Sequence, residues 1–152
     1  MPFLSDADQQ FLREKFAEGL QRPVQILLFT KREPALFIPG TPDADLTYLR
    51  QTRELLEEVA ALSEKIQMEV YDYISDSEAM RQHRLDKIPA VLVQSDGTAV
   101  RFIGVPAGYE FSTFVQDIFD VSTRNIELSP QHQEYLRNLE QDVHIQVFVT
   151  PT

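Results

Sequence analysis

The pattern of apolar and polar residues predicts a helix and then a buried strand near the start of the chain. Ser5 is a suitable N-cap residue, and Asp8 places an acid in the first turn of the helix that would follow. Residues 24–29 are almost continuously apolar, which is typical of a strand buried on both faces of a parallel sheet. The apolar residues of the helix share one face and are Phe11, Leu12, Phe16 and Leu20. We therefore expect an amphipathic helix followed by a central strand.

The next two elements predict a β-α-β unit. Residues 47–66 carry apolar side chains at steps of three and four, with glutamates between them, which indicates a long amphipathic helix. Residues 66–73 alternate between apolar and polar and predict a second strand. Because a helix connects the two strands, we expect them to be parallel.

The following stretch predicts a short helix, two antiparallel strands and a final helix. The short helix is expected around residues 76–83, and the final helix over residues 109–121, where apolar side chains share one face. Strands are expected at residues 90–94 and 100–103, because the four residues Ser95-Asp96-Gly97-Thr98 between them are a strong hairpin signal. The element order from residue 24 to residue 121 is therefore β-α-β-α-β-β-α.

The C-terminal residues repeat the opening plan of a capped helix followed by an apolar strand. Ser129 begins a helix expected to run to Leu139, and residues 143–149 predict another buried strand. We expect residues 1–122 to form the first domain, and residues 123–152 to form a linker, a helix and the first strand of an incomplete second unit. An exposed apolar strand promotes association. Residues 143–149 are therefore expected to join the edge of the first sheet or to pair with a second copy in a homodimer.

Composition narrows the classes of partner and chemistry. The net charge of −10 disfavours nucleic acid and anionic membrane surfaces as partners. No apolar run reaches the roughly 20 residues that a membrane-spanning helix needs, and the first ten residues do not resemble a signal peptide, so we expect a cytoplasmic protein. The absence of cysteine excludes disulfides, thiolate metal sites and a cysteine nucleophile.

Several stretches resemble a known family. They are VQILLFT, TRELLEEVAALSEKI, KIPAVLV, RFIGVPAGYEF and VHIQVFVTPT. With the element order, they resemble the N-terminal half of the glutaredoxin-like protein disulfide oxidoreductases, which contain two tandem thioredoxin folds. The resemblance implies an α/β thioredoxin-like fold, with a mixed sheet flanked by helices, an extra N-terminal helix, and a C-terminal helix and strand that begin a second thioredoxin unit. The N-terminal region of the alkyl hydroperoxide reductase flavoproteins has a related architecture and is kept as the alternative.

The resemblance also implies where redox chemistry would lie. A Cys-x-x-Cys pair normally precedes the segment that corresponds to residues 52–56, which places the two lost cysteines at Leu46 and Leu49. Leucine cannot form the thiolate that disulfide exchange requires, so the resemblance implies a redox-inactive domain. In relatives with a second active site, that pair would follow a stretch like residues 147–152. The sequence ends there, which indicates a truncation before the second motif.

Pro89 is the one thioredoxin signature that this chain retains, and the resemblance implies a cis peptide bond before it. Two roles stay open: the proline shapes the turn into the strand, or it leaves the backbone of Ile88 free to bind an extended peptide by strand addition. Residues 31–45 form an unusually long connection that includes the apolar run 35–38. We expect this loop to be a contact surface or a cover over the sheet. A glutathione site is not expected, because residues 87–89 and 104–108 do not match the glutaredoxin patterns.

The remaining polar residues do not indicate another chemistry. The three histidines lack metal-ligand spacing, so neither a metal nor another cofactor is expected; they are His83, His132 and His144. Three aspartates have no spacing tied to a known mechanism: Asp72, Asp76 and Asp86. The basic residues gather in one region but have acids beside them, which is typical of a solvated face: Arg81, Arg84, Lys87 and Arg101.

Two functions from different classes remain. A non-catalytic scaffold or interaction domain, attached to an active thioredoxin fold in a longer parent protein with thiol–disulfide oxidoreductase activity, predicts no thiol activity in this chain. A stand-alone module that binds a peptide or protein partner near Pro89 and the 31–45 loop predicts affinity without catalysis. An enzyme with acid–base or metal chemistry is not expected, because no arrangement of Asp, His and Tyr supports one.

Overall fold

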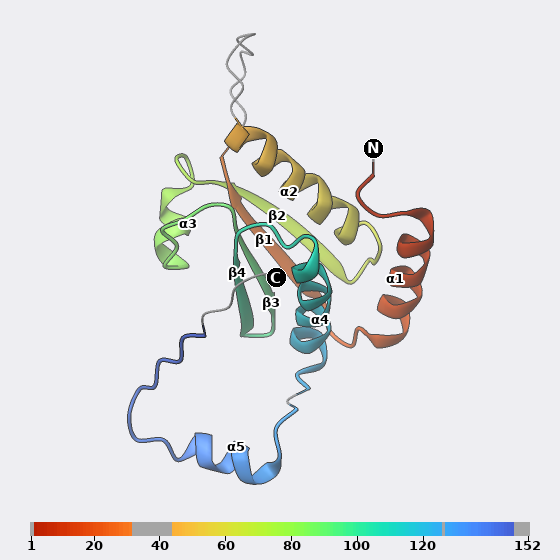
Figure 1. The fold of residues 1–152 in the computed structure, drawn as a ribbon. Coiled ribbons are helices and arrows are strands. Elements are labelled where there is room, and N and C mark those ends of the chain that lie inside the picture. The colour runs from red at the N-terminus through yellow and green to blue at the C-terminus, as the bar shows by residue number, and fades with distance from the viewer. Residues whose placement is uncertain (1, 32–43, 126, 148–152) are drawn as a thin grey trace.

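The apolar run that begins at Val24 forms a central strand of a mixed sheet (Figure 1). The computed structural model describes residues 2–31, 44–125 and 127–147. Within these residues the strands are ordered β2-β1-β3-β4. The parallel pair is β1 (Val24–Thr30) with β2 (Ile66–Asp72), and the antiparallel pairs join β1 to β3 (Ala90–Ser95) and β3 to β4 (Thr98–Ile103). The expected α/β fold class is confirmed.

Helices cover both faces of this sheet, but unequally. One face packs against α1 (Asp6–Gly19), α2 (Ala44–Ala60) and α4 (Tyr109–Thr123), while the short α3 (Ser77–Gln82) lies against the other (Figure 1). The composition of β1 follows from this arrangement, because successive side chains of a strand point to opposite faces. Ile26 and Leu28 belong to the larger core, whereas Leu27 and Phe29 belong to the smaller core beside α3. The predicted burial of this strand on both faces is confirmed.

Local sequence signals explain where several elements begin and turn. The Ser5 hydroxyl accepts a hydrogen bond from the Asp8 backbone N–H at 3.1 Å, which caps α1 as expected. Asp96 and Gly97 both have positive φ, 48° and 80°, in the two-residue turn between β3 and β4. A turn of this kind matches the twist of the two strands, and glycine adopts the second position without steric cost.

The second helix differs from the sequence prediction at both ends. It spans Ala44–Ala60, whereas the apolar spacing predicted a helix over residues 47–66. Leu62 and Ile66 continue the helical spacing and are buried, but Ile66 is already the first residue of β2. The chain turns between them: the Ile66 N–H donates to the Ser63 carbonyl at 3.0 Å, and Val24 N–H donates to the Lys65 carbonyl at 2.8 Å. Pairing with β1 therefore overrides the periodicity.

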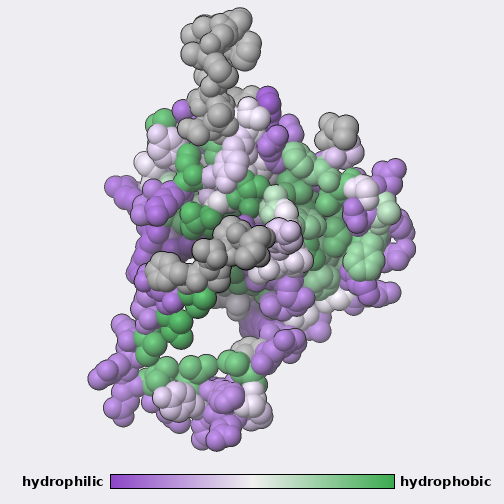
Figure 2. Space-filling model, viewed as in Figure 1, coloured by the Kyte–Doolittle hydropathy of each residue, from purple (hydrophilic) through white to green (hydrophobic). Residues whose placement is uncertain are grey.

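The structure corrects the prediction of a strand in the C-terminal residues. Helix α5 (Pro130–Arg137) forms behind its Ser129 cap, but none of its residues is buried, and apolar side chains lie open along it and along the segment that follows (Figure 2). The predicted strand at 143–149 does not form over its described part, residues 143–147, and does not join the sheet of its own chain. Alternating apolar residues suit a strand, but a strand also needs a partner for its backbone groups.

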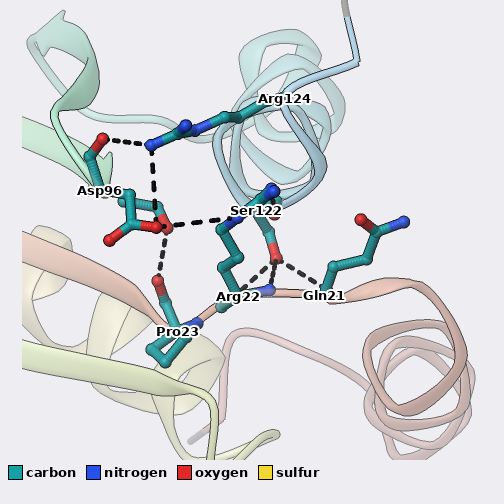
Figure 3. Close-up of polar contacts among 7 residues, drawn as sticks. Gln21, Arg22, Pro23, Asp96, Ser122 and Arg124 are labelled. Atoms are coloured by element: carbon teal, nitrogen blue, oxygen red, sulfur yellow. Dashed lines mark hydrogen bonds and ion pairs between the residues drawn. The ribbon is translucent and has the colours of Figure 1, made fainter.

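A polar cluster fastens the beginning of β1 to the end of α4 and to the β3–β4 turn (Figure 3). The Ser122 hydroxyl is buried; it accepts hydrogen bonds from the backbone N–H groups of Gln21 and Arg22, at 2.9 and 3.0 Å, and donates to the Arg22 carbonyl at 2.8 Å. The Asp96 carboxylate lies 3.7 Å from the guanidinium groups of both Arg22 and Arg124. Arg124 also donates a hydrogen bond to the Asp96 carbonyl. We call these residues the Ser122 cluster.

Candidate functional site

The structure brings Leu49, Ile88 and Pro89 together at one groove, although they are far apart in sequence. The groove has a volume of about 440 Å³. Its walls combine apolar and aromatic side chains with a few charged ones. The lining residues are Lys31, Tyr48, Leu49, Tyr73, Met80, Asp86, Lys87, Ile88 and Pro89. We call this hollow the Pro89 groove.

Five parts of the fold position these side chains. Tyr48 and Leu49 come from the N-terminal half of α2, Lys31 directly follows β1, and Met80 lies on α3. The other two parts are the turn after β2, which contributes Tyr73, and the turn before β3, which contributes Pro89. Leu49 and Met80 are buried, so the floor of the groove is apolar, while Tyr48 and Tyr73 are 46% and 41% exposed and form a rim that a ligand can reach. Such a surface suits an apolar or aromatic side chain with polar backbone beside it.

The backbone of Ile88 is open to an extended chain. Throughout the described ranges, its N–H and carbonyl groups make no hydrogen bond. The next residue is held in place: the Ile88–Pro89 peptide bond is cis, and the Pro89 carbonyl accepts a hydrogen bond from the Gly104 N–H at 2.9 Å. Free backbone groups beside a groove are what strand addition requires.

The two positions that the resemblance assigns to the lost cysteines are placed differently. Leu49 lies in the Pro89 groove and is 7% exposed. The backbone of Leu46 lies in the first turn of α2, but its side chain falls outside what the structure describes. The assignment of this pair therefore stays a prediction. The 31–45 loop also falls mostly outside the described residues.

A second hollow of about 610 Å³ adjoins the groove and shares Lys31 and Leu49 with it. It lies where β1 and β2 end, against α2. Thr30 lines it, and the Thr30 hydroxyl is buried with no hydrogen-bond partner among the described residues. Sequence reasoning missed this residue, because a threonine at the end of a strand is ordinary and only the unpaired buried hydroxyl sets it apart.

The acidic and aromatic residues nearby have structural partners. The Asp72 carboxylate accepts hydrogen bonds from the backbone N–H groups of Ile74 and Ser75, at 3.0 and 2.9 Å, which shapes the turn after β2. The Tyr71 hydroxyl donates to Glu69 at 2.7 Å, and this hydrogen bond raises the pKa of Tyr71, with burial adding to the effect. Both side chains are therefore engaged in hydrogen bonds close to their own strand.

The described residues give few signs of other chemistry. They hold no group of three or more metal-ligating side chains. His83 instead packs its ring against Phe29, with the ring centroids 5.4 Å apart, a contact that sequence reasoning missed. The helices in the described part of the chain are too short or too polar to cross a membrane.

Comparisons with known proteins agree with this fold. No protein-family model matches the chain. Over 105 residues it is 27% identical to the F component of alkyl hydroperoxide reductase (AhpF) of Staphylococcus aureus, and this match covers 68% of the chain but 18% of the relative. The chain therefore spans about a fifth of the length of these curated relatives.

Two solved structures match almost the whole chain. AhpF of Enterococcus faecalis, as a C503A mutant, aligns with a TM-score of 0.71 at 21% identity, covering 90% of this chain and 61% of that one. A protein disulfide oxidoreductase from Aeropyrum pernix aligns with a TM-score of 0.71 at 25% identity, covering 91% and 56%. Fold and weak sequence similarity together relate this cysteine-free chain to the AhpF proteins and the protein disulfide oxidoreductases.

Proposed function

We propose that this chain is a non-catalytic thioredoxin-fold domain that acts as a scaffold or interaction domain beside active thiol–disulfide proteins. One observation carries the proposal: Leu49 occupies the Pro89 groove at the position where the resemblance places a cysteine. A redox cysteine must be reachable and must ionise, which a helix N-terminus or a nearby cation promotes. Leu49 does neither, and its burial adds to the core instead.

Burial of Leu49 also stabilises the groove, although the groove carries no cysteine for thiol–disulfide exchange. Full burial of a leucine side chain contributes roughly 1.5–3 kcal/mol to folding. Leu49 is 7% exposed and packs where α2 meets the turn at Pro89. The position is therefore part of the packing of the fold, which suits a domain whose role is to hold a shape.

Disulfide reduction assays test the proposal. The chain is expected to show no turnover of insulin disulfides or of a glutathione mixed disulfide above the uncatalysed rate. A double variant, Leu46→Cys with Leu49→Cys, is expected to gain activity, because both positions lie in the N-terminal half of α2, where the helix dipole favours the thiolate. The matched control, Leu49→Cys alone, lacks the second thiol and should not turn over. Turnover by the unaltered chain would refute the proposal.

A second function is favoured by the free backbone of Ile88. As a binding module, the chain would hold an extended peptide beside Pro89, with a side chain of the peptide between Tyr48 and Tyr73. A titration with reduced insulin B chain, followed by amide NMR shifts, tests this. Shifts should concentrate at Ile88 and its neighbours and weaken in Tyr48→Ala, which removes an exposed wall of the groove. Equal shifts in both proteins would count against the groove.

The sequence similarity favours one setting for the scaffold. The 105 matched residues align with part of AhpF. The chain would then serve as an N-terminal-type domain of such a flavoprotein, packing beside a fold that carries active cysteines. Addition of the chain to a reductase that lacks only the corresponding cysteine-free fold, and keeps the fold with the active cysteines, tests this: restored peroxide reduction by the mixture would support the role, and no change would reject it.

A further inference from the structure

The β4 edge of the sheet is an open surface with unneutralised positive charge. β4 pairs with β3 alone within the described residues, so its outer backbone edge is free. Ile103 on this strand is 49% exposed. Arg101 lies along the same edge and donates hydrogen bonds to the carbonyls of His83 at 2.8 Å and Arg84 at 3.5 Å, which holds its guanidinium beside the turn after α3.

The charges at this edge stand out on a chain with a net charge of −10. Arg84 and Arg101 form no ion pair with any residue that the structure describes. Asp86 lies close to Arg84 in sequence and offsets part of the charge, whereas Arg81 is already paired with Glu78. An open strand edge with such a cluster attracts an extended segment that carries acids.

The chain itself carries a segment with that chemistry. Val143, Ile145 and Val147 alternate with polar residues and are 62%, 81% and 78% exposed. Glu140 and Asp142 come directly before them. The segment thus has the alternation of a strand with one apolar face, and acids at one end. In its own chain it pairs with no strand over residues 143–147.

We propose that residues 140–147 of one copy add to the β4 edge of a second copy, and reciprocally, so that the chain forms a homodimer. Residues 143–147 form the added strand, with their apolar side chains on the same side of the sheet as Ile103, and Glu140, which precedes this strand, lies beside Arg84 and Arg101. Strand addition satisfies the free backbone groups of both partners, and the apolar side chains lose their exposure to water. This inference does not depend on the proposed function, because it uses neither the Pro89 groove nor the missing cysteines.

The oligomeric state of the full chain tests the proposal. Light scattering across a wide range of protein concentrations should show the dimer mass, falling toward the monomer at high salt because the pairing is partly ionic. Ile145→Asp should raise the dissociation constant about tenfold or more, since it buries a charge among apolar groups. Gln146→Asp, with the same charge on the polar side of the segment, should change it far less. Both positions are exposed in the single chain, so both variants should fold, as circular dichroism will verify.

The absence of cysteine makes the contact itself testable. Single variants Ile103→Cys and Ile145→Cys, mixed under mild oxidation, should give a mixed disulfide dimer faster than Ile103→Cys mixed with Phe11→Cys on α1. A chain that is monomeric at every concentration would overturn the proposal. So would a dimer that Ile145→Asp leaves intact, or a monomer whose amides at 143–147 are protected from exchange, because the segment would then fold onto its own chain.

Discussion

The Ser122 side chain links α4 to the turn between α1 and β1, and Ser122→Ala isolates the contribution of its hydroxyl to the free energy of unfolding. The side chain is fully buried, and its hydroxyl serves two backbone donors and one backbone acceptor at the turn between α1 and β1. Alanine keeps the helix and removes a single oxygen. The substitution therefore leaves the N–H groups of Gln21 and Arg22 without the partner that the fold provides.

The cost follows from the number of groups left unpaired. An unsatisfied buried donor or acceptor costs about 1–3 kcal/mol. Gln21 is exposed and Arg22 is half-buried, so water can reach their N–H groups in part, which lowers the cost of each. We expect a total loss of about 2–3 kcal/mol in the free energy of unfolding. That is a large fraction of the roughly 5–15 kcal/mol that stabilises a typical domain.

Urea and thermal unfolding followed by circular dichroism measure this loss. For a chain of 152 residues, the expected loss lowers the midpoint temperature of unfolding by roughly 4–12 °C. The slope of the unfolding free energy against urea concentration, the m value, should not change. The control is Ser112→Ala on the same helix, where the exposed hydroxyl makes one hydrogen bond, to the Tyr109 carbonyl at 3.3 Å, and the change should stay within about 0.5 kcal/mol. Equal effects of the two substitutions would refute the reasoning.

Three further predictions concern two residues of α4, Phe114 and Asp117, and one residue of α1, Gly19, that lies against α4. Gly19→Ala should destabilise the fold by about 1–3 kcal/mol despite the better helix propensity of alanine, because the new methyl group would lie 2.6 Å from the Phe119 ring; urea unfolding measures it, and a gain in stability would contradict the close contact. Phe114→Ala should cost about 3–5 kcal/mol by the same measurement, because the ring is fully buried, and a loss below that of a surface substitution would contradict its place in the core. Burial and then the neighbouring Asp120 raise the pKa of Asp117, so its ionised form opposes folding above the folded-state pKa. Asp117→Asn should therefore stabilise the chain at neutral pH, and this advantage should shrink as the pH falls through that pKa; an advantage that grows on acidification would contradict the sign.

The elements with a strong local signal could be predicted from the sequence. The apolar run was sufficient to predict β1, and Asp96 and Gly97 were sufficient to predict the β3–β4 turn, because both depend mainly on residues close in sequence. The segment at 143–147 shows the limit of such signals. Its alternation describes a strand that needs a partner, and no local pattern tells whether the partner belongs to the same chain.

The candidate site was predictable in part. The resemblance drew attention to Leu49 and Pro89 separately, and the structure brings both to the same groove, while the assignment of the cysteine pair itself stays a prediction. The unpaired hydroxyl of Thr30 and the hydrogen bonds of Ser122 could not be foreseen, because each depends on which backbone groups the fold brings within about 3 Å. A single hydroxyl on a strand or helix has no periodicity that would reveal such contacts.

Leucine in the Pro89 groove makes the shape of this surface independent of the reduction potential around it. A thiol pair at this place would switch between two covalent states, and a ligand would meet a different surface in each. Here the sulfur that lines the groove belongs to Met80, a thioether that is 8% exposed. Methionine leaves its reduced state only under oxidants strong enough to form the sulfoxide, and not by exchange with thiols. A partner whose own disulfides open and close would therefore meet the same groove in both of its states.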